Sequence, residues 1–417
     1  MRSQNLAVGA GRLQGYAFAA AVLWAVLLLI PATGSKGDPV VRSGVDDDPE
    51  GAPYVAGELL VVYEPGTPEE VEETVIRQSG ARTLQDLPGE ARLVSFPAVR
   101  QEVSEEARER ALARELRDLE NNAKVEAADY NYIREASFTP DDPRLDDQWG
   151  LTKTRFPGAW TDAKGRGAKV AIVDSGAYAG HPDIGKILAQ KDFVEGNAVA
   201  DDDHFKGHGT RVTGVAGALT DNGRGVAGGC FKCGLLLAKV MNASGLATDS
   251  RIIKGMDWSV NHGADVENLS LGGPGYSGVL RDAVNRASRR GAVVVAAAGN
   301  EGTKVRQYPA AYSNAIAVSA TNQSDGLAYF SSYGDWVDLS APGTNILSTT
   351  RSGGYGKHSG TSFSAPFVSG LAGLLASQGM SADSIRQRMQ RSAKDLGPVG
   401  DDPRFGHGRI DANNAVR

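Results

Sequence analysis

Four short segments of the sequence carry side chains suited to acid–base and nucleophilic chemistry. Asp174 and Asn300 each end an apolar run, His208 stands between two glycines, and Ser362 follows a Gly-Thr pair. A serine hydroxyl needs a neighbouring base to become a nucleophile, and histidine exchanges protons near neutral pH. An acid holds such a histidine in one tautomer, and an amide donates to a developing oxyanion. The four residues therefore predict acyl-transfer chemistry.

The order Asp, His, Ser along the chain is one of the three known orders of the hydrolytic triad. Taken singly, Asp174 reads as a turn or cap residue, His208 and Ser362 as residues that begin helices, and Asn300 as a turn residue. The ordered set with its flanking glycines favours catalysis over these structural readings. The other histidines are expected to be structural or on the surface: His181, His204, His262, His358 and His407.

Short continuous apolar runs predict strands that are buried on both faces. These runs cover residues 169–173, 235–240, 266–269, 292–297 and 315–318. Helical patterns lie between them, over residues 210–219, 250–262 and 279–290. The alternation predicts an α/β domain with a doubly wound, mostly parallel sheet. Catalytic groups of such sheets gather beyond the carboxyl ends of the strands, where the motifs stand.

At these motifs the sequence resembles the subtilisin-like serine proteases of peptidase family S8. The resemblance runs from about Asp142 to Ala415. The segments Thr139-Pro-Asp-Asp-Pro143 and Asp147-Gln-Trp-Gly150 are similar to the mature N-terminus of the thermitase branch. The resemblance implies a serine endopeptidase with Asp174, His208 and Ser362 as its triad. It also implies that Asn300 donates to the oxyanion.

The resemblance also implies the residues of a substrate cleft. Ser270, Leu271 and Gly272 would pair with the substrate backbone as an edge strand. A wall of the primary pocket would consist of Ala297, Ala298 and Gly299, with Gln307 and Glu301 near its base and rim. These small residues predict broad acceptance of apolar or long side chains at P1. Asp249 stands where many relatives carry an aromatic lid. The alternative reading is that the set only packs the sheet.

A structural calcium site is a further implication of the resemblance. Oxygen ligands from acids, amides and turn carbonyls suit this hard ion. Side chains would come from Asp142, Asp183 and Asn222, and carbonyls from Thr220, Arg224 and Val226. From the residues alone, Asn222-Gly223 is a plain turn. The acids of residues 201–203 are expected to form a solvated loop, with a second ion as the alternative.

Cys230 and Cys233 are the two cysteines of the chain. In the cytoplasm this spacing would suggest a redox or metal motif. A secreted chain without further Cys or a nearby His pair cannot complete a zinc site with them. A local disulfide is therefore expected, and its small loop predicts a small contribution to stability.

Residues 1–34 read as a secretory signal peptide. Arg2 and Arg12 precede an apolar run over residues 16–30, and small residues follow it. The run is shorter than the ~20 residues of a typical membrane-spanning helix. We expect a secreted protein, which would meet a membrane only if this segment stayed uncleaved as an anchor. Residues 35–54 are rich in Asp, Gly and Pro and predict a linker.

Residues 55–137 alternate strand and helix patterns and predict a small α+β domain of ferredoxin-like type. The segment from 35 to 137 holds 12 basic and 23 acidic residues, although the whole chain has a net charge of only -6. This domain resembles the inhibitory propeptide that precedes the family's catalytic domain, here residues 138–417. The predicted partners are polypeptide substrates and the protein's own propeptide, and a monomer is expected. Without a basic excess, no nucleic-acid binding is expected.

Three hypotheses on function follow from the sequence. The first is a secreted, calcium-stabilised serine endopeptidase that is made as a self-processing zymogen. The second is a non-enzymatic relative that keeps the fold, which the four filled catalytic positions disfavour. The third is a protease for one target, or a peptide ligase, with the same chemistry; the motifs do not separate it from the first.

Overall fold

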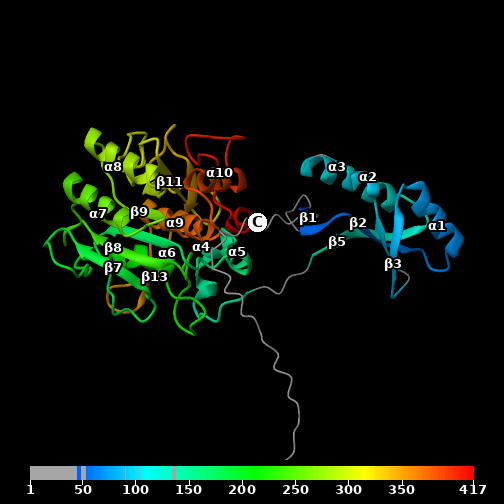
Figure 1. Ribbon diagram of the computed structural model, residues 1–417, viewed down its shortest axis with the longest axis horizontal. Coiled ribbons are helices and arrows are strands. Elements are labelled where there is room, and N and C mark those ends of the chain that lie inside the picture. Colours follow the sequence, from blue (N-terminus) through cyan, green and yellow to red (C-terminus); the bar gives the residue numbers. More distant parts are fainter. Residues whose placement is uncertain (1–44, 48–52, 90, 103, 134–137) are drawn as a thin grey trace, which may run out of the picture. The chain divides into compact units, whose positions relative to one another are not determined.

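The computed structural model describes residues 45–47, 53–89, 91–102, 104–133 and 138–417 (Figure 1). The expected signal peptide over residues 1–34 lies outside them. Within the described ranges, no helix combines the length and the apolar character that crossing a membrane requires. The described residues form two regions, each built on a sheet of its own.

The N-terminal region is an antiparallel sheet with helices. Its elements after β1 are β2 (Pro53–Tyr63), α1 (Glu69–Gln78), β3 (Arg82–Leu87), β4 (Ala91–Ser95), α2 (Pro97–Arg100), α3 (Glu105–Glu120) and β5 (Val125–Tyr132). The strand order is β3-β4-β2-β5, and each neighbouring pair is antiparallel. This order places the first and third strands of a βαββαβ unit at the centre, which is the ferredoxin-like topology. The predicted fold of this region is confirmed.

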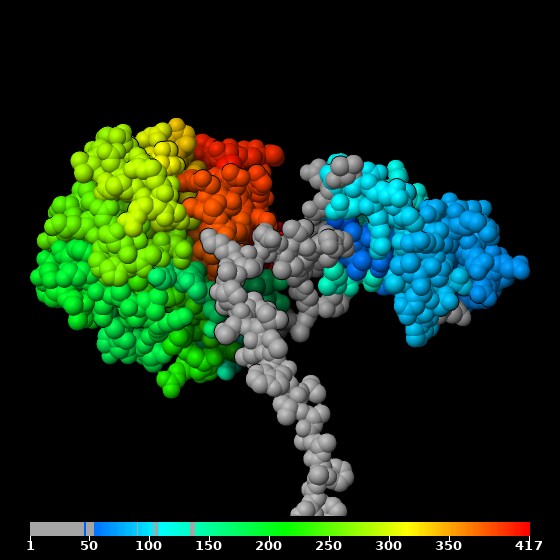
Figure 2. Space-filling view, viewed as in Figure 1, coloured from blue at the N-terminus to red at the C-terminus, as the bar shows by residue number. Residues whose placement is uncertain are grey.

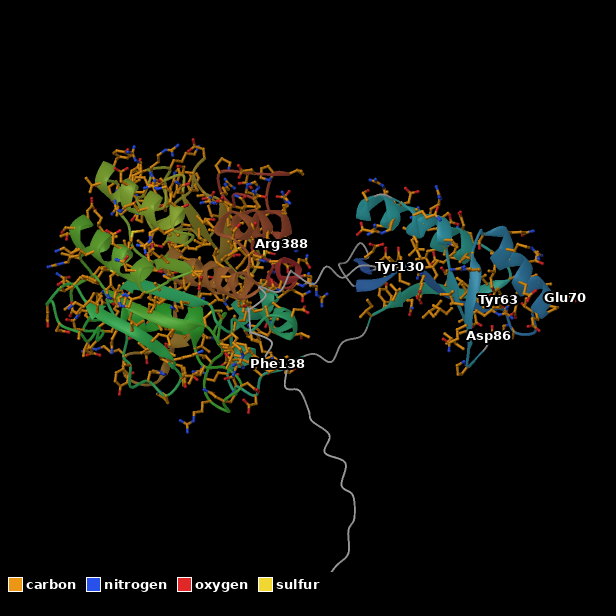
Figure 3. All side chains as sticks on the ribbon, viewed as in Figure 1. Tyr63, Glu70, Asp86, Tyr130, Phe138 and Arg388 are labelled. Carbon is orange, nitrogen blue, oxygen red and sulfur yellow. A yellow bond between two sulfur atoms is a disulfide. The ribbon has the colours of Figure 1, made fainter. Side chains whose placement is uncertain are left out.

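The core of this region lies between α3 and the sheet. Leu112 and Leu119 of α3 are buried in one cluster with Leu59 of β2. Tyr130 of β5, which is labelled in Figure 3, stacks on Tyr54 with ring centroids 4.3 Å apart. Leu112 and Leu119 thus lie on the packing face of the helix.

β1 (Val45–Asp47) lies within residues 35–54, for which the composition predicts a linker. β1 pairs antiparallel with the start of β2. The side chain of Asp46 is fully buried, and its Oδ1 accepts from Nη2 of Arg108 on α3 at 2.7 Å. This part of the expected linker is therefore structured, because a distant arginine supplies the charge partner that makes burial of Asp46 tolerable.

Residues 138–417, which the sequence predicts to be catalytic and which are called the catalytic region below, are built on a seven-stranded sheet. All neighbouring strands of this sheet are parallel. Its strand order is β12-β11-β10-β9-β6-β8-β7. The strands are β6 (Lys169–Asp174), β7 (Ile187–Asp192), β8 (Gly234–Lys239), β9 (Val266–Leu269), β10 (Val293–Ala297), β11 (Ala315–Thr321) and β12 (Leu339–Pro342). Five coincide with the predicted apolar runs. The two strands that the apolar runs did not predict, β7 and β12, are the edges of the sheet.

Helices cover both faces of this sheet (Figure 1). One face packs on α6 (His208–Gly217) and α9 (Thr361–Ser377), and the other on α7 (Asp249–Asn261) and α8 (Gly278–Arg289). Along β10, Val293 and Val295 belong to the first core and Val294 and Ala296 to the second. This alternation confirms the doubly wound α/β fold and explains the uninterrupted apolar runs.

The remaining elements complete the shell of the catalytic region. They are η1 (Leu145–Asp147), α4 (Trp149–Lys153), α5 (Phe156–Asp162), the hairpin β13 (Ile346–Thr349) and β14 (Tyr355–His358), α10 (Ala382–Ser392) and α11 (Ala412–Val416). α10 contacts both α9 and α11, and the orange and red segments lie together in Figure 2. The C-terminal helices α10 and α11 therefore pack beside α9.

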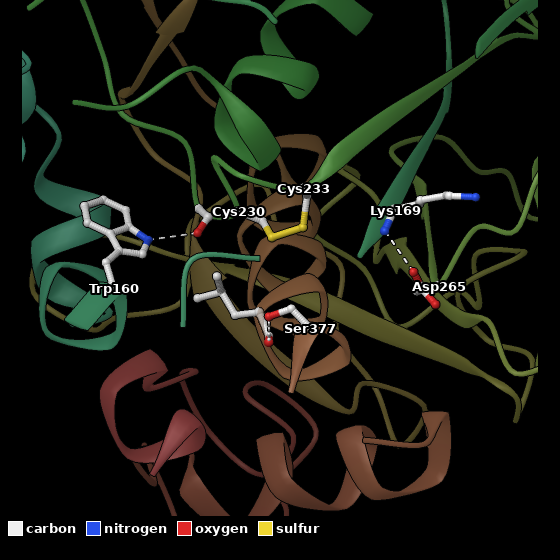
Figure 4. The surroundings of a disulfide bond; sticks show 8 residues. Trp160, Lys169, Cys230, Cys233, Asp265 and Ser377 are labelled. Carbon is white, nitrogen blue, oxygen red and sulfur yellow. Dashed lines mark hydrogen bonds between the residues drawn. A yellow bond between two sulfur atoms is a disulfide. The ribbon is translucent and has the colours of Figure 1, made fainter. Parts of the chain in front are cut away.

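A disulfide joins Cys230 and Cys233, as predicted, with their Cα atoms 5.4 Å apart (Figure 4). Both residues are buried, and a Cβ added to Gly165 would lie 2.1 Å from Sγ of Cys230. The indole of Trp160 donates to the carbonyl of Gly229 beside the bond at 3.0 Å. The disulfide is thus enclosed by core residues.

Candidate active site

Asp174 and His208 form a hydrogen-bonded pair at the carboxyl edge of the sheet. Asp174 is the last residue of β6 and His208 the first of α6. Nδ1 of His208 lies 2.7 Å from Oδ1 of Asp174, whose side chain is fully buried. Gly209 allows the two elements to meet, since a Cβ there would lie 2.0 Å from the carbonyl oxygen of Gly176. The carboxylate therefore fixes the ring orientation and leaves Nε2 as the ring nitrogen not bonded to Asp174.

The charge of Asp174 governs the pKa of His208. Burial disfavours the charged ring and lowers the pKa, but the charge and hydrogen bond of Asp174, together with the charge of Asp202, outweigh burial. The pKa of His208 is therefore raised above its ordinary 6.5. Such a ring is a stronger base than a free imidazole and holds a proton more firmly once it has accepted one.

A second buried acid, Asp202, supports this pair. It is fully buried, and its Oδ1 accepts from Oγ of Ser175 at 2.9 Å. Its Oδ2 accepts from the backbone N and Oγ1 of Thr210, at 2.9 and 2.6 Å. The expectation of a solvated loop over residues 201–203 is therefore wrong for Asp202. Three consecutive acids do not reveal which one is buried, because the donors belong to other elements: Ser175 follows β6 and Thr210 lies on α6.

Ser362 is the second residue of α9 and lies at the floor of the same site. It is 9% exposed, and its Oγ donates to the carbonyl of Ser270 at 3.3 Å. Oγ of Ser270 donates in return to the carbonyl of Ser362 at 2.8 Å. Among the described residues no hydrogen bond joins the Ser362 hydroxyl to His208, and such contacts are often loose in unliganded enzymes.

Asn300 follows β10 and is oriented by Thr361. Its Oδ1 accepts from the backbone N of Thr361 at 2.8 Å and from Oγ1 at 3.1 Å. A backbone N–H only donates, so the amide oxygen must face Thr361 and Nδ2 must point away from it. Oγ1 of Thr361 also accepts from the N of Gly299 at 3.1 Å. Sequence reasoning assigned Thr361 no role, although it stands inside the Gly-Thr-Ser motif.

A cleft of about 580 Å³ contains His208, Asn300 and Ser362. Most of the predicted subsite residues line it, namely Ser270, Leu271, Gly272, Ala297, Gly299 and Gln307. Glu301 and Asp249 line it too, as does His204, which was expected to be structural or on the surface. Leu246, Ile252, Tyr276 and Leu280 line the same cleft.

Ala298 is the exception among the predicted wall residues. It is fully buried within the core that packs on α7 and α8, and its N donates to the carbonyl of Val318 at 3.0 Å. The interpretation of its side chain as part of the pocket is corrected, because alternation along the strand turns it away from the cleft. Gly299 beside it is open to the cleft, and a Cβ there would lie 2.6 Å from Oε2 of Glu301 and 2.7 Å from Cγ of Gln307.

Asp142, Asp183 and Asn222 meet at a loop away from the cleft. Asp183 accepts from Nδ2 of Asn222 at 2.8 Å and from the N of Val226 at 2.8 Å. Oδ2 of Asp142 accepts from the N of Asp221 at 2.8 Å, while its Oδ1 is buried and has no partner among the described residues. The structure brings together the predicted acids and loop.

Two turn contacts stabilise this loop without using the expected carbonyl ligands of Thr220, Arg224 and Val226. Oγ1 of Thr220 accepts from the N of Gly228 at 3.0 Å, and Oδ1 of Asn222 accepts from the N of Arg224 at 2.9 Å. In the described part of the chain, no cluster of three or more His, Cys, Asp and Glu side chains could hold a metal ion. A cation here would therefore depend on carbonyl and amide oxygens as well as acids.

Comparison with known proteins gives the class of the protein. Residues 165–408 match the model of the subtilase family, peptidase S8. The chain belongs to this family and is a subtilisin-like serine endopeptidase, as the sequence motifs predict.

Relatives place it near the thermitase branch. Thermitase of Thermoactinomyces vulgaris is 43% identical over 282 residues, which are 67% of this chain and 100% of thermitase. The thermophilic serine proteinase of Bacillus sp. strain AK1 is 37% identical over 393 residues, 93% of this chain and 94% of the relative. A solved structure described as proteases from Pseudoalteromonas arctica PAMC 21717 is similar with a TM-score of 0.63 and 30% identity. It covers 67% of this chain and 99% of that one.

Proposed function

We propose that Asp174, His208 and Ser362 are the catalytic triad of a secreted endopeptidase that matures by cutting its own chain. The observation that carries the proposal is the 2.7 Å Asp174–His208 pair, whose His208 lines the same cleft as Ser362. The relative named as a thermophilic serine proteinase supports peptide bonds as the target.

In the proposed mechanism, His208 is the general base. The Ser362 hydroxyl turns from the Ser270 carbonyl to His208, gives up its proton and attacks the scissile carbonyl. Asp174 holds the ring and stabilises the imidazolium. His208 then protonates the leaving amine, and water hydrolyses the acyl-enzyme by the same route. Nδ2 of Asn300 donates to the oxyanion, aided by the N-terminal end of α9.

Substrate recognition is proposed to combine pairing with the substrate backbone and a primary pocket of broad specificity. Ser270, Leu271 and Gly272 follow β9 at the cleft and would pair with an extended substrate backbone. Ala297 and Gly299 leave room for apolar or long P1 side chains, with Gln307 and Glu301 next to Gly299. This arrangement supports a broad specificity at P1.

The experiment that tests the triad is labelling with a fluorophosphonate. The probe should modify Ser362 of the mature protein, as located by mass spectrometry, and should not label Ser362→Ala. Ser377→Ala is the matched control, because this residue lies at the far end of the same helix. Labelling of Ser362→Ala at an equal rate would rule out Ser362 as the nucleophile.

Residues 55–137 are proposed to act as an inhibitory propeptide and folding template. Their ferredoxin-like fold and acidic composition support this, since opposite charge favours association with a slightly basic catalytic domain. The cut is proposed within residues 134–141, part of which lies outside the described residues. Purified Ser362→Ala should keep its propeptide, and its removal there would contradict self-processing.

A structural calcium ion is proposed at the loop of residues 220–226. The buried, unpaired Oδ1 of Asp142 fits a cation, and burial, with the charges of Asp183 and Asp141, raises the pKa of Asp142 to about 6. Asp142, Asp183 and Asn222 would hold the ion by side chains, and Thr220, Arg224 and Val226 by carbonyls. The ion would neutralise these acids and tie the segment before η1 to the loop.

Secretion and a monomeric state complete the proposal. The signal peptide predicted over residues 1–34 is the basis for secretion, and a retained segment would instead anchor the protein. N-terminal sequencing of the protein recovered from the culture medium tests both the export and the maturation site. A product that begins at residue 1 and stays with the cells would contradict both the export and the maturation.

A further inference from the structure

A second pocket in the catalytic region is lined by three cations. It has a volume of about 370 Å³, and its lining residues are Phe205, Lys206, Gly207, Arg211, Thr350, Arg351 and Ser352. It shares no lining residue with the catalytic cleft, and no acid lines it. The residues come from the loop that leads into His208, from α6 and from the turn between β13 and β14. Nothing in the proposed mechanism uses this pocket.

Arg211 has no partner for its guanidinium among the described residues. Its Nε is buried and makes no hydrogen bond. Burial lowers the pKa of Arg211, and the charge of Asp202 only partly offsets it. The carboxylate of Asp202 is engaged by Ser175 and Thr210 instead. Burying a cation costs free energy when no anion accepts its hydrogen bonds. The Arg211 side chain is therefore suited to bind an anion from a ligand.

The other two cations lack carboxylate partners as well. Within the described residues, Lys206 has its Nζ 5.2 Å from the ring centroid of Phe205 and forms no ion pair. Arg351 reaches only backbone carbonyls, those of Asp203 at 3.4 Å and His204 at 3.5 Å. Elsewhere in this region arginines such as Arg286 lie within 2.9 Å of a carboxylate. Three cations without a carboxylate partner among the described residues therefore line one pocket.

We propose that this pocket binds a small oxyanion, namely a carboxylate, sulfate or phosphate group. A guanidinium presents parallel N–H donors that match two oxygens of such a group, and two further cations add charge. Thr350 and Ser352, whose hydroxyls are 3.0 Å apart, supply additional donors. The oxyanion is either free in solution or the carboxylate of an acidic side chain of the bound polypeptide. The second source rests on the proposed protease function, and the first does not.

Direct binding is tested on the inactive Ser362→Ala protein, so that its result does not depend on proteolysis. Crystals soaked in selenate should show anomalous scattering between Arg211 and Arg351. Calorimetric titration with sulfate at constant ionic strength should be saturable. Arg211→Gln should weaken the affinity for sulfate by about tenfold, the scale of one charge-assisted bidentate contact. Lys254→Gln, which removes an exposed charge from α7, should leave the affinity for sulfate unchanged.

The source of the oxyanion is tested on the active enzyme with peptide libraries. Glu is compared with Gln at each position on both sides of the scissile bond. A preference for Glu at one position, lost in Arg211→Gln and suppressed by sulfate, identifies the substrate carboxylate. Sulfate binding without such a preference identifies a free oxyanion. Titrations that do not saturate, or that are equal in the Arg211→Gln and parent proteins, would overturn the proposal.

Discussion

The backbone N–H of Thr361 donates to Oδ1 of Asn300 across 2.8 Å, and this contact decides which end of the amide faces the cleft. The hydroxyl of the same threonine donates to that oxygen and accepts from the N of Gly299. Thr361 is therefore a positioning residue for the proposed oxyanion donor, and it precedes the proposed nucleophile directly.

Loss of the Asn300 amide should lower kcat far more than it raises KM. Asn300→Leu is expected to cost about 10² to 10³ in kcat, the range known for one such donor in a subtilisin. Thr361→Val should give a smaller loss, because the backbone N–H still orients the amide, and Thr361→Ser should restore most of it. Steady-state kinetics on a peptide substrate provide the measurement. Equal kcat values for Asn300→Leu and the parent enzyme would remove Asn300 from the mechanism.

The pH dependence of kcat/KM should follow His208. The base must be neutral to accept the proton, so activity rises as pH passes through its pKa. Because the pKa of His208 is raised, the acidic limb should lie above pH 6.5.

Loss of the Asp202 charge should shift the acidic limb of the kcat/KM profile. Its charge contributes to the raised pKa of His208, so Asp202→Asn should shift the acidic limb to lower pH. Asp201→Asn is the control, since this neighbour is exposed and makes no such contribution. A pH profile that stays in place in Asp202→Asn, with normal folding, would show that Asp202 has only a structural role.

Glu267 should make the protein less stable as pH rises. It is fully buried on β9, and burial raises its pKa from 4.5 to about 8, against the hydrogen bond from Ser259. Between these two values the folded chain holds a proton that the unfolded chain has lost. The contribution of Glu267 is thus complete below pH 4.5 and is lost as pH rises through about 8.

Glu267→Gln should remove this dependence. On the Ser362→Ala background, which prevents autolysis, the melting temperature of the parent should fall more between about pH 4.5 and about pH 8, the span of the shift, than that of the variant. Glu195→Gln, at an exposed position, should behave like the parent. Parallel melting curves for Glu267→Gln and the parent would mean that Glu267 is already ionised in the fold.

Removal of calcium should destabilise the catalytic domain. A chelator is expected to lower the melting temperature of the Ser362→Ala protein, and added calcium should restore it in proportion to ligand binding. Asp142→Asn should weaken this response, whereas Asp146→Asn, at an exposed position nearby, should keep it. If a chelator left the melting temperature of the parent protein unchanged, the calcium proposal would be contradicted.

The sequence by itself determined the α/β architecture, the family and the candidate catalytic residues. Continuous apolar runs mark strands buried on both faces, and Asp174, His208 and Ser362 stand in short motifs at the ends of elements. Local patterns of this kind carry such information because burial and turn formation depend on neighbouring residues.

Only the tertiary structure decided which side chains meet. Asp202 is buried while the adjacent Asp201 is exposed, and Arg211 is left unpaired in a basic pocket. The strand order puts β9 between β6 and β10, which brings Ser270 to the carbonyl and hydroxyl of Ser362. Ser270 and Ser362 are 92 residues apart along the chain. A shift of one residue in an extended segment also moves a side chain to the opposite face, as for Ala298. Periodicity predicts the buried face of an element, but the partner across that face depends on the packing of the whole domain.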